Sequence, residues 1–335
     1  MAKKYYGQEI QKVTDYYLSE INQRAAALGK KFEVIYEDGK CTGNDSVSAF
    51  HKLVDVDGIK FILGGSCSSE TLGIAPLTKD SNKVLVISAL SSNPVINGLS
   101  PFTYSFSYSD DTSGKIIAKQ MSAYKKVAII SEQNDFNIGI KKVWEDALKQ
   151  YPGAQVVANE IFPKGASDFR VILEKVKKAQ PEAIFLNPNP GVTAQNLIKQ
   201  LAEIKDWTNY KLYSHYSYLA EDTLKVAPTV VEGMIIIDAP KLTDPGFLSL
   251  KQQIEATKGT VADLGDYYTA STMDVMNVVT SLITELGENP QAVRDALATR
   301  TFQGYIGSIH FGNNNFPDIA AAVYKVINGK PELQP

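Results

Sequence analysis

Apolar and polar residues follow a helical spacing at the start of this chain. Between residues 8 and 28, apolar side chains recur every three or four positions, at Ile10, Val13, Tyr17 and Ile21. A repeat of this kind predicts an amphipathic helix, which buries one face and leaves the other in solvent.

From residue 30 onward, short runs of β-branched and aromatic residues alternate with longer helical patterns. The short runs predict strands, and the stretches between them predict helices. Strands are expected at 32–37, 60–65, 84–89, 126–131, 155–162, 183–187, 211–215, 233–238, 306–311 and 320–327. Helices are expected at 45–56, from Glu70, and at 112–123, 137–150, 168–179, 192–204, 220–226, 244–258, 267–286 and 289–299.

Helices between successive strands imply parallel sheets with right-handed crossovers. Two such series follow one another, and later segments return after the second series. A chain of 335 residues is also too long for one ordinary α/β core. We therefore predict an α/β fold with two doubly wound, parallel-sheet lobes that are joined by several crossings of the chain.

The composition narrows the classes of function. The formal net charge is -3 and the chain has no long basic run, which argues against nucleic acid as a partner. No apolar run approaches the length that spans a membrane. The first residues, MAKKYYGQEIQ, lack the apolar segment of a secretory signal.

The stretch Phe61–Thr71, FILGGSCSSET, predicts a buried strand, a glycine turn and a helix start. Glycine after the strand lets the backbone come close to a ligand. The N–H groups of the first helical turn have no partner inside the helix, and the helix dipole favours negative charge, so a carboxylate or phosphate binds there readily. Ser68 and Ser69 add hydroxyls at this place. The alternative is that these serines only cap the helix.

Polar stretches of a similar kind follow the other predicted strands. In doubly wound sheets, ligands bind beyond the carboxyl ends of the strands, so these stretches are candidates for a site. The loop 187–191 has a second interpretation, because its Pro and Gly residues are typical of a helix start. The candidate residues in the other loops are Leu90, Ser91, Ser92, Phe136, Tyr216 and Ser217.

An enzyme is the main rival class. His51, His215 and His310 lie far apart in the sequence, and only His215 falls at a predicted strand end. The chain has no metal-ligand spacing, nucleophile elbow, P-loop or G-x-G-x-x-G motif. We therefore expect a protein that binds without catalysis, and we expect no cofactor and no metal.

The two cysteines, Cys41 and Cys67, each follow a predicted strand. If those strands are neighbours in one sheet, the thiols come within bridging distance. Otherwise both are free and buried. A bridge would imply an oxidising compartment.

Several short motifs follow one another in order over nearly the whole chain. They are Tyr6-Gly7, Tyr36-Glu37-Asp38 before Cys41, Gly64–Thr71, Asn93-Pro94, Phe136–Gly139, Asp168-Phe169, Glu232-Gly233, Met273-Asp274, and Phe302, Gly304, Gly307 and Phe311. No single motif is specific, but the ordered set resembles the type I periplasmic-binding-protein family. The resemblance is to its branched-chain amino-acid (leucine/isoleucine/valine-binding) branch, the substrate-binding proteins of ABC transporters.

The resemblance implies a two-lobed protein that closes on a small ligand, an amino acid or a related carboxylate or amide. It would deliver this ligand to an ABC permease in the membrane. The first lobe would comprise residues 1–107 and 240–311, and the second 108–239 and 312–335. A monomer outside the cytoplasm is implied, in the periplasm or at the cell surface, free or lipid-anchored. The alternative on the same fold is a ligand-sensing receptor or regulatory domain that is not coupled to transport.

The resemblance also implies roles for single residues. Ser68 matches the position that binds the ligand carboxylate, and Leu90 and Ser92 match positions that meet the ammonium group. Cys41 and Cys67 match a disulfide pair, which favours an extracytoplasmic location. Three aromatic residues match the walls around the ligand: Tyr6, Phe136 and Tyr268.

The chain departs from the family pattern in two places. Family members begin with a strand before the Tyr-Gly pair, but Met1 stands shortly before Tyr6. We therefore expect the first strand of lobe one to be missing, with a gap in its sheet. The branch also places an acidic residue where Tyr216 or Ser217 stands here. We expect that this chain either does not bind an amino acid or uses another acid, such as Asp135, for the ammonium group.

Overall fold

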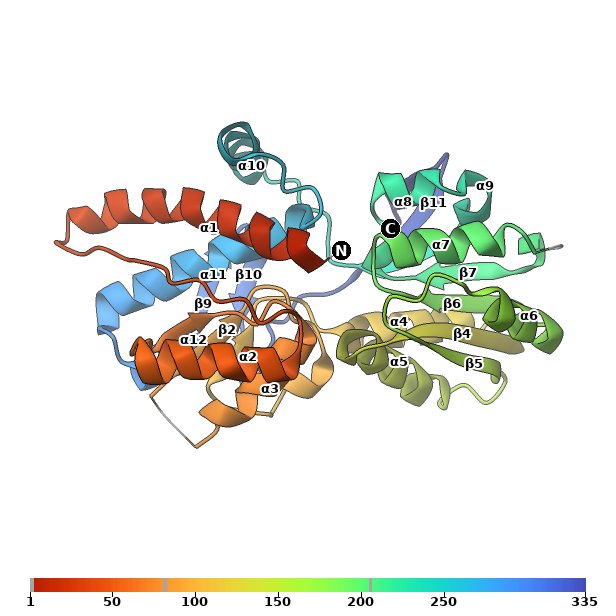
Figure 1. Cartoon of the computed structure of the whole chain (residues 1–335), viewed down its shortest axis with the longest axis horizontal. Coiled ribbons are helices and arrows are strands. Elements are labelled where there is room, and N and C mark those ends of the chain that lie inside the picture. Colours follow the sequence, from red (N-terminus) through yellow and green to blue (C-terminus); the bar gives the residue numbers. More distant parts are fainter. Residues whose placement is uncertain (1–2, 81–82, 205–206) are drawn as a thin grey trace. The chain divides into compact units, whose positions relative to one another are not determined.

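The computed structural model describes residues 3–80, 83–204 and 207–335, with the backbone alone for residues 3–5. The chain divides into two compact units (Figure 1). Unit 1 comprises Lys3–Ser109 and Lys241–Ile319, and unit 2 comprises Asp110–Pro240 and Ala320–Pro335. The chain therefore passes between the units three times.

The crossings follow Ser109, Pro240 and Ile319. Residues 312–319 are tied to unit 1 through Asn315. Its side-chain amide donates to the carbonyl oxygens of Ser100, at 2.9 Å, and Thr103, at 2.6 Å. Its Oδ1 accepts from the N–H of Gly98 at 2.7 Å.

Unit 1 is built around a three-stranded parallel sheet with the order β1-β2-β3. Its strands are β1 (Phe61–Leu63), β2 (Leu85–Ser88) and β3 (Thr103–Ser105), and a separate antiparallel pair is formed by β9 (Thr301–Gly304) and β10 (Gly307–His310). Its helices are α1 (Lys3–Ala26), α2 (Gly43–His51), α3 (Ser68–Thr78), α10 (Pro245–Lys258), α11 (Gly265–Leu286) and α12 (Pro290–Thr299), with short helical turns at Lys52–Val56 and Pro94–Ile96.

The central strand of this sheet, β2, is buried along its whole length. One cluster of its core joins α2, β1, α3 and β2 through Phe50, Ile62, Ile74 and Val86. The long helices α1 and α11 lie side by side (Figure 1). The alternation of strand and helix predicted for this part of the chain is therefore confirmed for β1, α3 and β2.

The strand predicted at 32–37 is wrong. The segment has no ladder partner among the described strands, and its backbone bonds to side chains of α1 instead. The N–H of Phe32 donates to Asn22 Oδ1 at 2.7 Å, and Asn22 Nδ2 donates to the Phe32 carbonyl at 2.9 Å. The Tyr36 hydroxyl donates to Asp15 Oδ1 at 2.6 Å. Among the described strands, only β2 lies beside β1.

Unit 2 contains a seven-stranded sheet with the order β12-β11-β8-β7-β6-β4-β5. Its strands are β4 (Lys126–Gln133), β5 (Gln155–Pro163), β6 (Ala183–Asn187), β7 (Lys211–Ser214), β8 (Ile235–Asp238), β11 (Ala322–Ile327) and β12 (Lys330–Leu333). Its helices are α4 (Asp110–Met121), α5 (Asp135–Leu148), α6 (Arg170–Ala179), α7 (Val192–Leu201), α8 (Glu221–Lys225) and α9 (Pro228–Val231), with short turns at Trp207–Asn209 and Tyr216–Tyr218.

Helices cover both faces of this sheet (Figure 1). On one face, α6, α7, α8 and α9 pack on residues such as Ala128 and Ile130 of β4. On the other face, Ile117 of α4 and Trp144 of α5 pack on the alternate β4 residues, including Ile129. Burial on both faces explains why β4 and β6 are nearly continuous apolar runs.

The last two strands of unit 2 are antiparallel, whereas the sequence predicted parallel sheets. Ala322 of β11 pairs with Asp238, the last residue of β8. The chain thus enters β11 at the edge where β8 ends, and it must run the opposite way. The turn to β12 contains Asn328 and Gly329, which both have positive φ, as a tight hairpin requires.

Candidate ligand-binding site

The N-terminus of α3 is fixed by one carboxylate. The helix begins at Ser68, with Cys67 as its N-cap, two residues earlier than the start expected at Glu70. The Glu70 side chain accepts from the N–H of Cys67 at 3.0 Å and from the N–H of Cys41 at 2.9 Å. Ser68 and Ser69 are therefore first-turn residues, and their N–H groups have no acceptor within the helix.

The two cysteines form a disulfide, with their Cα atoms 5.3 Å apart. Cys41 lies before α2 and Cys67 before α3, so the bridge joins the starts of two helices. Of the two interpretations of the sequence, a disulfide or two free thiols, the structure has the disulfide.

Three hydroxyls converge on the carbonyl oxygen of Gly65, at the end of β1. Ser88 Oγ lies 2.7 Å from it, Ser91 Oγ 2.9 Å and Thr71 Oγ1 3.0 Å. Ser88 Oγ also accepts from the N–H groups of Leu90 and Ser91. A Cβ at Gly65 would lie 2.8 Å from the N of Thr71, so only glycine fits this approach. These contacts fix the loop after β2 against the start of α3.

The candidate residues of this loop have different exposures. Ser91 is buried and its hydroxyl is used within the loop, at 2.6 Å from Thr71 Oγ1. Ser92 is also buried, whereas Leu90 is half-buried. Ser91 therefore stabilises the conformation of the loop, and this conformation holds Leu90 and Ser92 near the start of α3.

The candidate tyrosines of unit 1 lie on helices that are attached to this region. Ser271 of α11 donates to the carbonyl of Ala89, just after β2, at 2.8 Å. Tyr268 lies one turn before Ser271 and is half-buried. Tyr6 is half-buried on α1, whose Glu9 accepts from the N–H of Leu264 just before α11, at 2.6 Å. Burial raises the pKa of Glu9.

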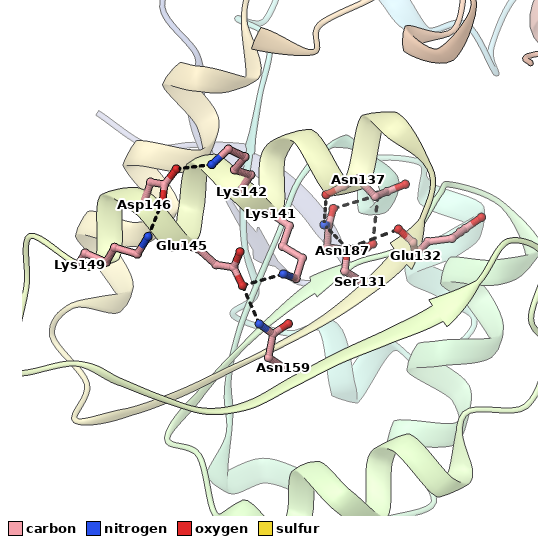
Figure 2. A network of polar contacts seen from close by, with 10 residues as sticks. All are labelled: Ser131, Glu132, Asn137, Lys141, Lys142, Glu145, Asp146, Lys149, Asn159 and Asn187. Carbon is pink, nitrogen blue, oxygen red and sulfur yellow. Dashed lines mark hydrogen bonds and ion pairs between the residues drawn. The ribbon is translucent and has the colours of Figure 1, made fainter. Parts of the chain in front are cut away.

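In unit 2, two asparagines join the ends of β4 and β6. Figure 2 shows Asn137, Asn187 and Ser131 pointing toward one another. Asn137 Nδ2 donates to Asn187 Oδ1 at 2.9 Å, and Asn187 Nδ2 donates to Ser131 Oγ at 2.8 Å. All three side chains are fully buried. The loop 187–191 thus does more than start α7, because its first residue holds the start of α5.

His215 extends this network to the end of β7. Its Nε2 lies 2.7 Å from Asn187 Oδ1, an acceptor, which places a proton on Nε2. The ring is completely buried, and burial lowers the pKa of His215 to about 3, so the imidazole is neutral. Ser217 is also buried, and its hydroxyl donates to the carbonyl of Pro188 at 2.6 Å. The Ser217 hydroxyl is therefore used within the protein.

Three rings form one cluster at this strand end. The Phe136 ring meets His215 at 5.2 Å and Tyr216 at 5.4 Å between centroids, both edge-on. The centroids of His215 and Tyr216 are 5.3 Å apart. Phe136 and Tyr216 are half-buried. The structure thus brings together two predicted site residues and one histidine that the sequence did not assign.

A carboxylate, Glu132, lies beside this network at the end of β4. It accepts from the N–H of Asn189 at 2.9 Å and from Asn189 Nδ2 at 3.2 Å. The residue is buried, and burial raises its pKa. The sequence reasoning missed the roles of Glu132, Asn137 and Asn187. A signal was present, because Glu132 and Asn187 are polar residues at the ends of largely apolar strands, and Asn137 lies in the first turn of the helix that follows β4.

Within residues 3–80, 83–204 and 207–335, no group of His, Cys, Asp and Glu side chains could hold a metal ion. None of the described helices has the length and apolar character needed to cross a membrane. Two α/β units with polar and aromatic loops at their strand ends define a protein that binds small molecules.

The chain belongs to the periplasmic binding protein family, whose family model matches residues 2–331. The family consists of binding proteins that act outside the cytoplasm, not of enzymes. The predicted family, the α/β fold class and the class of function, a periplasmic binding protein, are therefore confirmed.

Relatives named for branched-chain amino acids are distant in sequence. The leucine-, isoleucine-, valine-, threonine- and alanine-binding protein of Pseudomonas aeruginosa is 24% identical over 310 residues, which cover 88% of this chain and 78% of that protein. The match to the Leu/Ile/Val-binding protein of Escherichia coli covers 50% of this chain and 46% of that protein.

Solved structures share the fold over nearly the full chain. A solute-binding protein from R. palustris in complex with 4-hydroxybenzoate has a TM-score of 0.84 at 17% identity and covers 100% of this chain and 92% of its own. A branched-chain amino-acid-binding protein from Streptococcus pneumoniae in complex with isoleucine has a TM-score of 0.80 at 21% identity, with 98% and 94% covered.

Proposed function

We propose that this chain is the extracytoplasmic solute-binding component of an ABC importer and that its ligand is a small organic acid. The observation that carries the proposal is the start of α3. There a glycine turn, two first-turn N–H groups and the hydroxyls of Ser68 and Ser69 lie together at the end of a parallel strand. Unpaired N–H groups and the helix dipole both favour a carboxylate.

The ligands named for similar proteins support this class. The P. aeruginosa relative is named for aliphatic amino acids, and the R. palustris structure holds 4-hydroxybenzoate. These molecules share a carboxylate and little else. We assign the carboxylate to Ser68 and the start of α3, with Ser69, Leu90 and Ser92 beside it. We also propose Tyr6 and Tyr268 as ligand contacts of unit 1. For unit 2, the proposed ligand contacts are Phe136 and Tyr216.

The partner we propose is an ABC permease in the membrane, which receives the ligand from a monomeric binding protein. The disulfide between Cys41 and Cys67 supports a location in an oxidising compartment, with the chain free or lipid-anchored.

The test is a ligand screen by thermal unfolding, followed by calorimetric titration. An organic acid at a hundred times its dissociation constant should stabilise the chain by about 2.7 kcal/mol. Ser68→Leu should abolish this shift, because the larger side chain covers the first-turn N–H groups. Ser68→Ala, which keeps the N–H, should weaken binding only about tenfold, the equivalent of one hydrogen bond.

Ser48→Leu is the matched control, since Ser48 is exposed on α2 of the same unit. It should bind the acid like the wild type. Circular dichroism without ligand checks that each variant is folded. Unchanged acid binding by a folded Ser68→Leu variant would remove the start of α3 from the site.

A further inference from the structure

The loop after β2 has one open backbone carbonyl between two that are occupied. The Ala89 carbonyl oxygen accepts from Ser271 Oγ of α11 at 2.8 Å. The Ser91 carbonyl oxygen accepts from Ser105 Oγ of β3 at 2.6 Å. Within the residues that the structure describes, the Leu90 carbonyl oxygen has no hydrogen-bond partner. Of the three carbonyls in this run, the half-buried Leu90 therefore has the one that is left for a ligand.

Ser88 determines the direction of this carbonyl. Its Oγ accepts from the N–H of Ser91 at 2.9 Å and from the N–H of Leu90 at 3.2 Å. The Ser91 N–H and the Leu90 carbonyl belong to the same peptide unit, and in a planar trans peptide these two groups point in opposite directions. Because Ser88 binds the N–H, the Leu90 carbonyl is directed away from Ser88.

The Ser88 hydroxyl uses its full hydrogen-bonding capacity in this arrangement. A hydroxyl has one proton to donate and two lone pairs that accept. The two N–H groups take the lone pairs, and the proton goes to the Gly65 carbonyl oxygen at 2.7 Å. Ser88 is fully buried, so solvent does not compete for these bonds. Ser88 thus joins the loop with the open carbonyl to the glycine turn that leads into α3.

The neighbouring peptide units are held as well. In the unit between Ala89 and Leu90, Ser271 binds the carbonyl and Ser88 binds the N–H. In the next unit but one, the carbonyl of Ser91 is bound by Ser105, which is itself fully buried. All of these residues belong to unit 1. The orientation of the open carbonyl is therefore fixed from β2, β3 and α11 of one unit.

We infer that Ser88 is a positioning residue, which directs the Leu90 carbonyl toward a hydrogen-bond donor next to the ligand carboxylate. The inference rests on the proposed function, which assigns that carboxylate to the start of α3. Ser88 does not bind the ligand itself, because its proton and both lone pairs are used within the protein. It acts through the orientation of one peptide unit, which Ser271 and Ser105 support.

The experiment uses three acids with one carbon skeleton. Leucine, 2-hydroxy-4-methylpentanoate and 4-methylpentanoate have an ammonium group, a hydroxyl group or neither beside the carboxylate. Titration calorimetry on the full chain should give tighter binding for the two acids that have a donor. Ser88→Ala should weaken the binding of both about tenfold, the equivalent of one hydrogen bond, and leave 4-methylpentanoate nearly unchanged. A purely structural role of Ser88 would weaken all three acids alike.

Ser100→Ala is the matched control. Ser100 is a buried serine of unit 1 whose Oγ accepts from the N–H of Phe102 at 3.1 Å, but it lies before β3, at the other end of the sheet from Ser88. This variant should bind all three acids like the wild type. Ser88→Thr keeps a hydroxyl and should restore the preference for acids with a donor. If Ser88→Ala does not fold, Ser271→Ala tests the same orientation, because it frees the Ala89 carbonyl and should lower the same preference.

Amide hydrogen exchange, measured by NMR, tests the orientation without a ligand. The N–H groups of Leu90 and Ser91 should exchange slowly in the wild type and in Ser100→Ala, and rapidly in Ser88→Ala. Unchanged protection in Ser88→Ala, or an equal loss of binding for all three acids, would overturn the inference and leave the carboxylate site in place. A wild type that binds 4-methylpentanoate as tightly as the other two acids would overturn it as well. Failure of the folded wild type to bind any of the three would overturn the proposed function and the inference together.

Discussion

His215 links three strand ends of unit 2 although it touches solvent nowhere. It reaches Asn187 through Nε2, and its Nδ1 lies 3.2 Å from Ser217 Oγ. Its ring also packs edge-on against Phe136. A buried side chain with this many fixed neighbours orients the half-buried rings of Phe136 and Tyr216 beside it.

The burial of His215 predicts a pH dependence of stability. The unfolded chain takes up this proton near pH 6.5, but the folded chain does so only near its lowered pKa of about 3. Between these values the unfolded state binds more protons, so falling pH destabilises the fold. The loss from this residue should reach roughly 2 kcal/mol at pH 5, with no further loss below pH 3.

Glu132 and Asp274 have raised pKa values, so through these carboxyl groups falling pH stabilises the fold and opposes the effect of His215. Comparison of the wild type with His215→Gln removes their contribution and isolates that of His215. Denaturant unfolding of wild type and variant is measured from pH 7 to pH 4. The stability advantage of the wild type should shrink as the pH falls. A constant difference over this range would mean that the pKa of His215 is the same in the folded and unfolded states.

Among the elements, α3 is held at its start by both local and distant contacts. Its first turn is held by the Glu70 carboxylate, which is local, and by the disulfide to Cys41, which is not. Glu70 also bonds the N–H of Cys41, so the same two loops are joined twice. The strand-end geometry proposed for the carboxylate site therefore has both a covalent and a polar support.

Removing the disulfide should lower the stability of unit 1 without opening the site. The bridge closes a separation of 26 residues, for which the loss of chain entropy corresponds to about 3 to 4 kcal/mol. We expect Cys41→Ala combined with Cys67→Ala to lose about this amount in denaturant unfolding. Acid binding should persist, because Glu70 still holds both N–H groups.

Glu70→Gln in the disulfide-free background is the complementary variant. It should lose acid binding as well as stability, since neither support remains intact. A disulfide-free protein that is as stable as the wild type would show that Glu70 alone fixes these loops.

The whole molecule consists of two units with separate cores, joined by three crossings. Calorimetry of the full chain is expected to show two unfolding transitions, one for each unit. A ligand stabilises only what it contacts, by mass action. If the ligand carboxylate binds at α3, an organic acid should raise the transition of unit 1.

The Ser68→Leu variant assigns the ligand-induced shift to the start of α3, because it should remove that shift. A wild-type chain whose unit 1 transition is unchanged at saturating acid would contradict a carboxylate site at α3.

Much of the fold follows from local patterns in the sequence. Apolar stripes predicted α1, α5 and α11, and short β-branched runs predicted β4 and β6, because burial of one face or of both faces requires those spacings. The glycine turn before α3 was also predictable, since the start of a helix after a strand is encoded within a few residues. The segment 32–37 had the right composition but pairs with none of the strands that the structure describes, and a strand forms only when another pairs with it.

The pairing of distant residues was decided by the tertiary structure alone. Asn137 and Asn187 are 50 positions apart, and His215 is 28 positions beyond Asn187, yet all three meet at one sheet edge. No local pattern carries the strand order that brings them together. The sequence by itself determined which residues stand at strand ends. It also contains none of the catalytic motifs, which favours a binding protein. Which of those residues touch was decided by the order of the strands, which the packing of helices on both faces sets. The physical reason is that residues on adjacent strands lie side by side whatever their separation along the chain.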